Sequence, residues 1–196
     1  MPGYDTPAQE VRPVKILIAG GFGVGKTTLV ETVSEIEPLR TEERLTSAGV
    51  GVDDLDGIES KAVTTVAMDF GRITLTDAQV VLYLFGTPGQ ERFWFMWDDL
   101  LNGALGAIVL VDTRRLDRSF PAVDFFENRG LPFVVGANCF HGEQPYTVEE
   151  IRAALHLVDP ETPVLLLDAR SRDDVRGALL SLLDMLIARA DVVASG

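Results

Sequence analysis

The sequence contains few of the features that mark secreted, disulfide-linked or membrane-spanning proteins. It has one cysteine, Cys139, among 196 residues, so no internal disulfide can form. No apolar run approaches the roughly 20 residues that a transmembrane helix needs, and neither terminus carries a secretory or lipidation signal. These absences predict a soluble protein of the reducing cytoplasm, with a peripheral position at a membrane, through a partner, left open.

Basic residues are also scarce. The chain has 17 Lys and Arg against 30 Asp and Glu, which gives a formal net charge of −13. Such a surface repels nucleic acids and anionic lipids, so neither is expected as a partner. Only Lys15, Lys26 and Lys61 supply lysine, and a lysine inside a glycine-rich loop is therefore conspicuous.

The length suits a single domain. Residues 1–12 are polar with two prolines and are predicted to be a flexible tail, which leaves 13–196 as the domain. Residues 37–62 show no strong hydrophobic periodicity and are predicted to be a long loop.

Apolar strand patterns alternate with helical patterns along the rest of the chain. The strands are expected at 14–20, 65–75, 79–86, 106–112, 131–138 and 162–169, and helices follow the first strand and occupy about 91–102, 116–129, 147–158 and 171–190. This alternation predicts a three-layer α/β domain with a six-stranded, mostly parallel sheet, in which five strands are parallel and the second is antiparallel.

The first strand leads into a glycine-rich segment with the full Walker A spacing, "GGFGVGKT" at 20–27. Its backbone amides would surround a phosphate at the start of a helix, Lys26 would neutralise the β and γ phosphates, and Thr27 would bind Mg²⁺. The residues expected at the nucleotide are Gly20, Gly21, Phe22, Gly23, Val24, Gly25, Lys26, Thr27 and Thr28. The alternative is a glycine-rich turn that binds nothing.

Two later motifs, "TVAMDF" (65–70) and "GTPGQERF" (86–93), follow this loop in the order of the two switches of Ras-like P-loop small GTPases. The resemblance covers about residues 14–190 and implies the small GTPase fold. It implies that Thr65, with Thr64 as the alternative, contacts Mg²⁺ and the γ phosphate, that Gly89 senses this phosphate, and that Gln90 orients the attacking water.

A closer resemblance is to the bacterial conservon GTP-binding proteins, through "FGTPGQERFWFMWDDL", "VDTRRL" and the long segment before the first switch. These proteins are encoded beside a sensor-kinase-like protein and a roadblock-type partner. The resemblance implies a signalling role with such a partner.

The sequence departs from the Ras-like pattern at two places. Gly86 replaces the aspartate that usually holds a magnesium-bound water, which predicts weaker affinity for the ion. In the base-recognition motif, "NCFH" (138–141) retains Asn138 but has His141 in place of the aspartate that reads guanine. The resemblance also implies that the Ala169 amide contacts the base and that Arg170 stacks on it.

Four large aromatic residues, Phe93, Trp94, Phe95 and Trp97, directly follow the second switch. They cannot all face one side of a helix, so at least one is expected to form a partner surface. Arginine-finger candidates are left open among Arg40, Arg44, Arg92, Arg114 and Arg115.

The favoured hypothesis is a guanine-nucleotide-binding switch that hydrolyses GTP slowly, with GTP or GDP and Mg²⁺ as ligands and with Gln90 and Lys26 in catalytic roles. One rival is a docking module that no longer depends on nucleotide. A second is a switch that uses ATP or no particular base, prompted by His141.

Overall fold

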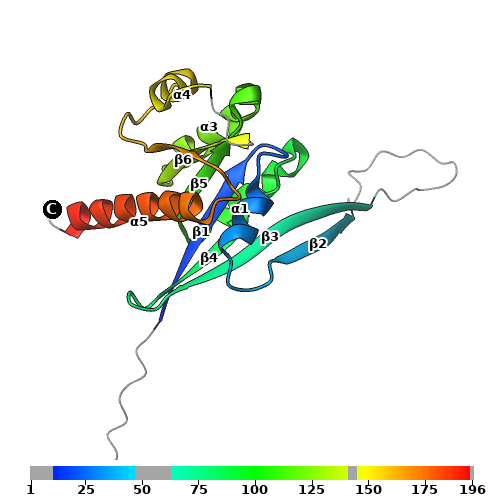
Figure 1. The fold of residues 1–196 in the computed structure, drawn as a ribbon. Coiled ribbons are helices and arrows are strands. Elements are labelled where there is room, and N and C mark those ends of the chain that lie inside the picture. The colour runs from blue at the N-terminus through cyan, green and yellow to red at the C-terminus, as the bar shows by residue number, and fades with distance from the viewer. Residues whose placement is uncertain (1–10, 47–62, 141–144, 195–196) are drawn as a thin grey trace, which may run out of the picture.

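A computed structural model describes residues 11–46, 63–140 and 145–194 of the chain (Figure 1). Its strands are β1 (Arg12–Gly20), β2 (Leu39–Thr46), β3 (Val63–Leu75), β4 (Val80–Gly86), β5 (Ala104–Val111), β6 (Phe133–Asn138) and β7 (Val164–Leu167). Its α-helices are α1 (Lys26–Val33), α2 (Trp97–Leu101), α3 (Phe120–Arg129), α4 (Val148–Leu155) and α5 (Arg172–Ala194), and two 3₁₀ segments are η1 (Glu91–Met96) and η2 (Thr113–Arg118).

The described strands form one sheet of seven strands in the order β2-β3-β4-β1-β5-β6-β7. Strand β1 pairs in parallel with both β4 and β5, and β6 and β7 continue the parallel arrangement. Strand β3 is antiparallel to β4 and to β2. The predicted α/β class, the five parallel strands and the antiparallel second strand of the predicted set are therefore confirmed.

Strand β2 is the additional element. The prediction of a loop over 37–62 is wrong for Leu39–Thr46, which pairs with β3 along its whole length, whereas residues 47–62 lie outside the described part. The segment "LRTEERLT" is polar because β2 is an edge strand, stabilised mainly by main-chain hydrogen bonds, so it lacks the apolar pattern of a buried strand. In Figure 1 the β2–β3 pair extends beyond the rest of the sheet.

The two faces of the sheet carry separate cores, because side chains of β1 alternate between them. Ile16 and Ile18 pack with Leu29 of α1 and Leu182 of α5, whereas Leu17 packs on the other face with Phe126 of α3 and with α2 and α4. Figure 1 shows α1 and α5 on one side of the sheet and α3 and α4 away from them. The three layers hold β1 at the centre, with its C-terminal end at the ligand-binding edge expected for such sheets.

The helices begin and end where local sequence signals require. Thr147 and Glu150 form a capping box at the start of α4, as their spacing indicates. The helix predicted over 116–129 is instead divided at Ser119 into the end of η2 and α3, with Pro121 in the first turn of the new helix. In the described part of the chain, no helix is long and apolar enough to cross a membrane.

Candidate functional site

The glycine-rich loop connects the central strand β1 to α1 and leaves the start of this helix without a side-chain cap. Gly25, the residue before the helix, has φ 110°. A Cβ at this position would lie 2.7 Å from Nδ2 of Asn138, so both the backbone conformation and the close approach require glycine. The first-turn amides of α1 and its positive dipole end are therefore available to an anion.

Lys26 begins α1 and is buried in the loop. Its ammonium group donates hydrogen bonds to the carbonyl oxygens of Gly20 (2.8 Å) and Gly21 (2.7 Å). Burial lowers the pKa of Lys26 to about 8, and the negative charge of Asp69 partly opposes this shift. Lys26 is thus a cation at neutral pH, held in place by backbone carbonyls, that loses its proton more readily than an ordinary lysine.

Thr27 is held by Asp69, a residue of β3. The Thr27 hydroxyl donates a hydrogen bond of 2.6 Å to Oδ2 of Asp69. A Cβ built on Gly86 would lie 3.1 Å from both Cβ and Oδ2 of Asp69. The carboxylate of Asp69 therefore occupies the space beside Gly86, where the second motif lacks its aspartate.

Gly89 of the second motif packs directly on the loop. A Cβ at Gly89 would lie 2.6 Å from Nζ of Lys26 and 3.0 Å from the carbonyl of Gly21, so this approach also requires glycine. The preceding Pro88 carbonyl accepts a hydrogen bond of 3.0 Å from the Trp97 indole. Gln90 is half-buried and follows at the N-cap of η1, in extended conformation.

These residues surround a cavity of about 310 Å³ at the end of the sheet. Its lining consists of Phe22, Gly23, Gly25, Lys26, Thr27, Thr28, Asp69, Thr87 and Gly89. A larger cavity of about 370 Å³ lies between α5 and β3, but its lining is mainly leucine and isoleucine. The smaller cavity is the candidate site because it combines a fixed cation, a carboxylate and an uncapped helix start.

The remaining loop residues differ in burial. Gly20, Gly21 and Val24 are buried or half-buried, and Val24 packs into the core of the α1 face. Phe22 is 65% exposed although it lines the cavity. The loop thus presents one large apolar side chain at the mouth of the site.

Several predicted site residues do not line this cavity. Gln90, Asn138, Ala169 and Arg170 are described but lie outside its lining, and the side chains of Thr65 and His141 lie outside the described part. The backbone of Thr65 lies in β3, paired with Arg44, and its side chain is outside the described part. It precedes Asp69 by four residues, which is about 13 Å along a strand. His141 lies outside the described residues. The metal and γ-phosphate roles of Thr65 and the base-binding role of His141 remain predictions.

Asn138 ends β6 and links the two halves of the site. Its Nδ2 donates to the Val24 carbonyl (2.9 Å), and its Oδ1 accepts from the Ala169 amide (3.1 Å). The Ala169 amide, which was predicted to contact a base, therefore donates its hydrogen bond to Asn138 in this structure. Cys139 is half-buried beside them, and its amide donates to the Leu167 carbonyl.

Arg170 is exposed and pairs with Asp168 through bonds of 2.6 Å and 2.9 Å. The Arg170 guanidinium is thus held by Asp168 of the same loop. The prediction that Arg170 stacks on a base did not foresee this ion pair. The pKa of Arg170 is raised by these hydrogen bonds. The stacking of Arg170 on a base remains a prediction.

Arg114 is fixed by Asp112, which accepts from its Nε and Nη2 at 2.9 Å each and caps η2 through the Arg114 amide. The same guanidinium lies 3.8 Å from the ring centroid of Phe140. Arg115 also contacts Asp112, and Arg92 lies over Phe93. Arg114, Arg115 and Arg92 are thus engaged elsewhere, and the side chains of Arg40 and Arg44 are outside the described part.

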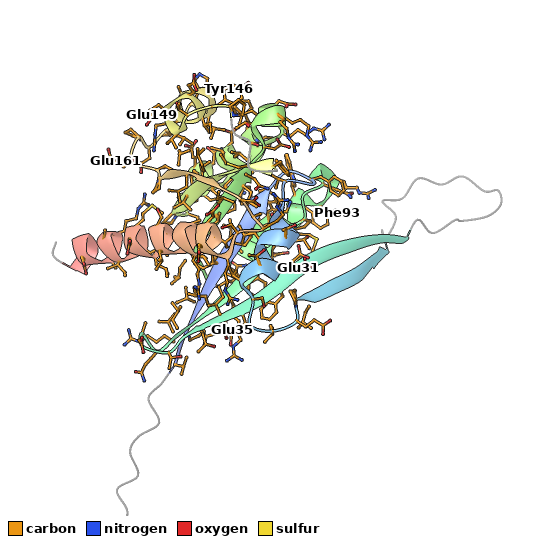
Figure 2. The ribbon with its side chains drawn as sticks, viewed as in Figure 1. Glu31, Glu35, Phe93, Tyr146, Glu149 and Glu161 are labelled. Atoms are coloured by element: carbon orange, nitrogen blue, oxygen red, sulfur yellow. The ribbon has the colours of Figure 1, made fainter. Side chains whose placement is uncertain are left out.

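The aromatic cluster divides as expected from its spacing. Trp97 is buried against Phe125 and Phe126 of α3, and Phe93, labelled in Figure 2, is also buried. Phe95 points outward and is 64% exposed. The prediction that at least one ring is exposed is confirmed.

Asp69 and Thr87 line the cavity but were not among the site residues predicted from the sequence. Asp69 lies in the "VAMDF" stretch of β3. A single acidic residue in this apolar stretch was the available signal, because buried carboxylates are rare unless they are paired. Among the described residues there is no group of three or more His, Cys, Asp or Glu that could hold a metal by itself.

Comparisons with known proteins identify a family and a fold for the chain. A family model described as "Conserved hypothetical ATP binding protein" matches residues 18–189. An uncharacterised protein of Methanocaldococcus jannaschii, MJ1339, is 30% identical over 127 residues, covering 64% of this chain and 69% of that protein. The human Ras-related protein Rab-7b is 29% identical over 150 residues, but the match spans only 63% of its length.

Among solved structures, the cytosolic domain of the T. maritima FeoB iron transporter in a GDP form matches with a TM-score of 0.63. The match covers 90% of this chain and 64% of that chain, at 15% sequence identity. This likeness concerns the fold, which is that of P-loop GTPase domains.

Proposed function

The chain belongs to the family of conserved hypothetical ATP-binding proteins, and we propose that it is a guanine-nucleotide-binding switch that hydrolyses GTP slowly with Mg²⁺. One observation carries the proposal. A buried lysine, an uncapped helix start and a Thr27–Asp69 pair line one cavity of about 310 Å³ at the end of the central strand. A protein that only offered a docking surface would not require these three features together.

The phosphates would bind at the start of α1. The amides of its first turn and of the glycine-rich loop would donate to the phosphate oxygens there, where the helix dipole favours negative charge. Lys26 is held by the carbonyls of Gly20 and Gly21, so its ammonium is positioned before a ligand arrives. Preorganisation of this kind reduces the ordering cost of binding.

The residues present fit Mg²⁺, which prefers oxygen ligands and is usually held by one or two carboxylates together with substrate phosphates. Thr27 and Asp69 would hold the ion, and Asp69 would take the part that Gly86 cannot. When bound, Mg²⁺ neutralises charge that develops on the phosphates during hydrolysis. The 2.6 Å contact between Thr27 and Asp69 supports this assignment because it brings the hydroxyl and the carboxylate together.

For hydrolysis, we assign Gln90 to orient the attacking water and Lys26 to stabilise the developing charge. Gly89 lies against Lys26 and would sense the γ phosphate through its amide. Thr65 would contact the γ phosphate and the ion only after the first half of β3 has moved, because about four residues of strand separate it from Asp69. Such a movement is a change between two nucleotide states.

The movement of the second switch would reach a partner through Phe95. The Trp97 indole, at the start of α2, donates a hydrogen bond to the Pro88 carbonyl and so holds the second motif to the core. The exposed Phe95 lies in the segment between these two residues. A roadblock-type or sensor-kinase-like protein is the partner class proposed for this surface, as the resemblance to conservon proteins implies. The rival, a docking module without nucleotide, would keep this surface but make no use of Lys26.

A switch that does not distinguish guanine from adenine is the second candidate function. The family description refers to ATP, whereas "GTP-binding protein ypt2" of Schizosaccharomyces pombe is 29% identical over 101 residues, half of this chain and 40% of that protein. Guanine is favoured here because the Rab and Ypt relatives belong to the Ras-like group. A nucleotide switch with little base discrimination is the alternative, since no carboxylate stands at position 141.

Calorimetric titration of the full chain with GTP, GDP and ATP, each with MgCl₂ and with EDTA, tests the proposal. Tighter binding of GTP and GDP than of ATP, strengthened by Mg²⁺, is expected. Comparable affinities would support the second candidate, and failure to bind any of the three would contradict both and favour the docking module.

Turnover provides the catalytic part of the test. The variant Gln90→Leu should bind GTP and GDP as the original chain does, but should release phosphate at least about tenfold more slowly, since water positioning contributes at least this much. Equal single-turnover rates would remove Gln90 from the catalytic assignment.

A further inference from the structure

Thr87, the residue after Gly86, has a buried hydroxyl group that the fold does not use. The residue is 3% exposed, and its Oγ1 is one of two buried side-chain polar atoms without a hydrogen-bond partner among the described residues. Its backbone is fixed, because the Thr87 amide donates to the Ile18 carbonyl at 2.8 Å. A buried hydroxyl without a partner destabilises a fold, so its presence at a fixed position calls for a ligand.

The surroundings of Thr87 identify the chemistry of this ligand. Thr87 lines the same cavity as Lys26, Thr27 and Asp69. The other unpartnered atom, Nε1 of Trp94, belongs to a residue packed beside Trp97 in the core and does not line the cavity. Among the described residues, Thr87 is therefore the one cavity-lining residue whose buried side-chain polar atom has no partner.

We infer that the Thr87 hydroxyl binds a water molecule in the hydration shell of the nucleotide-bound divalent cation, beside Asp69. This inference rests on the proposed function. Thr87 directly follows Gly86, which lies against the Asp69 carboxylate, and Thr87 and Asp69 both line the cavity. Mg²⁺ keeps several of its waters in proteins, and each water donates hydrogen bonds that a hydroxyl oxygen accepts.

The assignment makes Thr87 a positioning residue. It would act on the ion through a water molecule, as groups outside the direct ligands do when they orient a metal site. The Lys26 side of the cavity supplies cationic and amide donors suited to phosphate oxygens. The Asp69–Thr87 side supplies acceptors suited to a hydrated cation.

Two variants separate the hydroxyl from the shape of the side chain. Thr87→Val keeps the branched shape and removes the hydroxyl, whereas Thr87→Ser keeps the hydroxyl. For each variant, GDP affinity is measured by calorimetry with MgCl₂ and with EDTA, and the ratio of the two affinities is compared with that of the original chain. Thermal unfolding without nucleotide is measured in parallel.

The expected result is a roughly tenfold smaller Mg²⁺ ratio for Thr87→Val, near the lower end of the effect of outer groups on metal affinity. Its GDP affinity in EDTA should be unchanged, and Thr87→Ser should retain the original ratio. Without nucleotide, Thr87→Val should unfold at the same temperature or about 2–4 °C higher, because it removes a buried unpartnered group.

Three results would overturn the inference while leaving the proposed function intact. These are an unchanged Mg²⁺ ratio in Thr87→Val, an equal loss of GDP affinity with and without Mg²⁺, which would assign the hydroxyl to a phosphate, and a Thr87→Ser variant that behaves like Thr87→Val. An original chain that binds none of GDP, GTP and ATP would contradict the proposed function itself, and with it this inference.

Discussion

The phosphate side and the base side of the candidate site are built from different kinds of contact. On the phosphate side, Lys26, Thr27 and Asp69 face a common cavity and bond to one another or to the loop backbone. On the base side, Asn138 bonds to the Val24 carbonyl and to the Ala169 amide. The first set of groups is arranged around a space, whereas the second is engaged in holding the loops together.

The difference shows which part of nucleotide recognition tolerates sequence change. Phosphate binding depends largely on backbone amides and a helix start, which only glycines and a lysine need to support. Base reading depends on particular side chains, and a single replacement such as His141 removes its carboxylate. A carboxylate nevertheless stands beside Gly86, since Asp69 of β3 occupies that space.

The largest effect is expected on the phosphate side. Lys26→Ala should reduce GDP and GTP affinity by more than about 100-fold, because it removes a buried cation whose charge-assisted contacts to phosphate are strong. Lys15→Ala is the matched control, since Lys15 bonds to the Asn102 carbonyl away from the cavity. Calorimetry that found equal affinities for the two variants would remove Lys26 from the site.

The position of the metal carboxylate can be exchanged. Asp69→Ala should reduce the Mg²⁺-dependent gain in GDP affinity by about 10- to 100-fold. Adding Gly86→Asp to this variant should restore part of the gain, because the space that Asp69 leaves would receive a carboxylate. Calorimetry with MgCl₂ and with EDTA measures both effects.

Two controls accompany this exchange. Asp98→Ala removes an exposed carboxylate that pairs with Arg129 and should leave the Mg²⁺ gain unchanged. Gly86→Asp alone should lower the unfolding temperature, because its Cβ would crowd Asp69 at 3.1 Å and place two carboxylates together. A double variant with no more Mg²⁺ response than Asp69→Ala would contradict the exchange.

On the base side, His141→Asp should raise the ratio of GTP to ATP affinity by about tenfold, because the new carboxylate accepts two hydrogen bonds that guanine donates and adenine does not. His156→Asp is the matched control, as His156 is exposed at the end of α4. Competition of both nucleotides against a fluorescent GDP analogue gives the ratio. An unchanged ratio would mean that the loop does not face the base.

The smallest effect concerns pH. Because the pKa of Lys26 without ligand is about 8, phosphate binding above this pH must take up a proton, and GDP affinity should fall about tenfold between pH 7 and pH 9. Calorimetry at pH 8.5 in two buffers of different ionisation enthalpy measures the uptake. Binding without proton uptake at that pH would contradict the lowered pKa.

Stability without nucleotide should change in the opposite sense. The pKa of Lys26 is lower in the fold than in the unfolded chain, where it is about 10.4. Between about pH 8 and this value the unfolded chain binds more protons, so this lysine makes the free energy of unfolding rise with pH. Lys26→Ala provides the reference curve for thermal unfolding.

Much of this arrangement could be predicted from local patterns. The apolar runs predicted six of the seven strands, and the Walker A spacing placed Lys26 and Thr27 at the start of α1. Strand β2 was missed because an edge strand is stabilised through its backbone and carries little apolar signal. Gly86 alone predicts weaker affinity for Mg²⁺. That Asp69 lies beside Gly86 could not be predicted, because the two residues are far apart in the sequence.

The sequence by itself determined the alternation of strands and helices, the glycine-rich loop and the exposed position of one switch aromatic, because each depends on residues close together in the chain. Only the tertiary structure decided that Asp69 meets Thr27 across 42 positions, that Asn138 holds the loop, and that Thr87 lines the cavity with its hydroxyl buried and unpartnered. The physical reason is that sheet pairing brings β1, β3 and β4 to one edge, and contacts between neighbouring strands have no fixed spacing in the sequence.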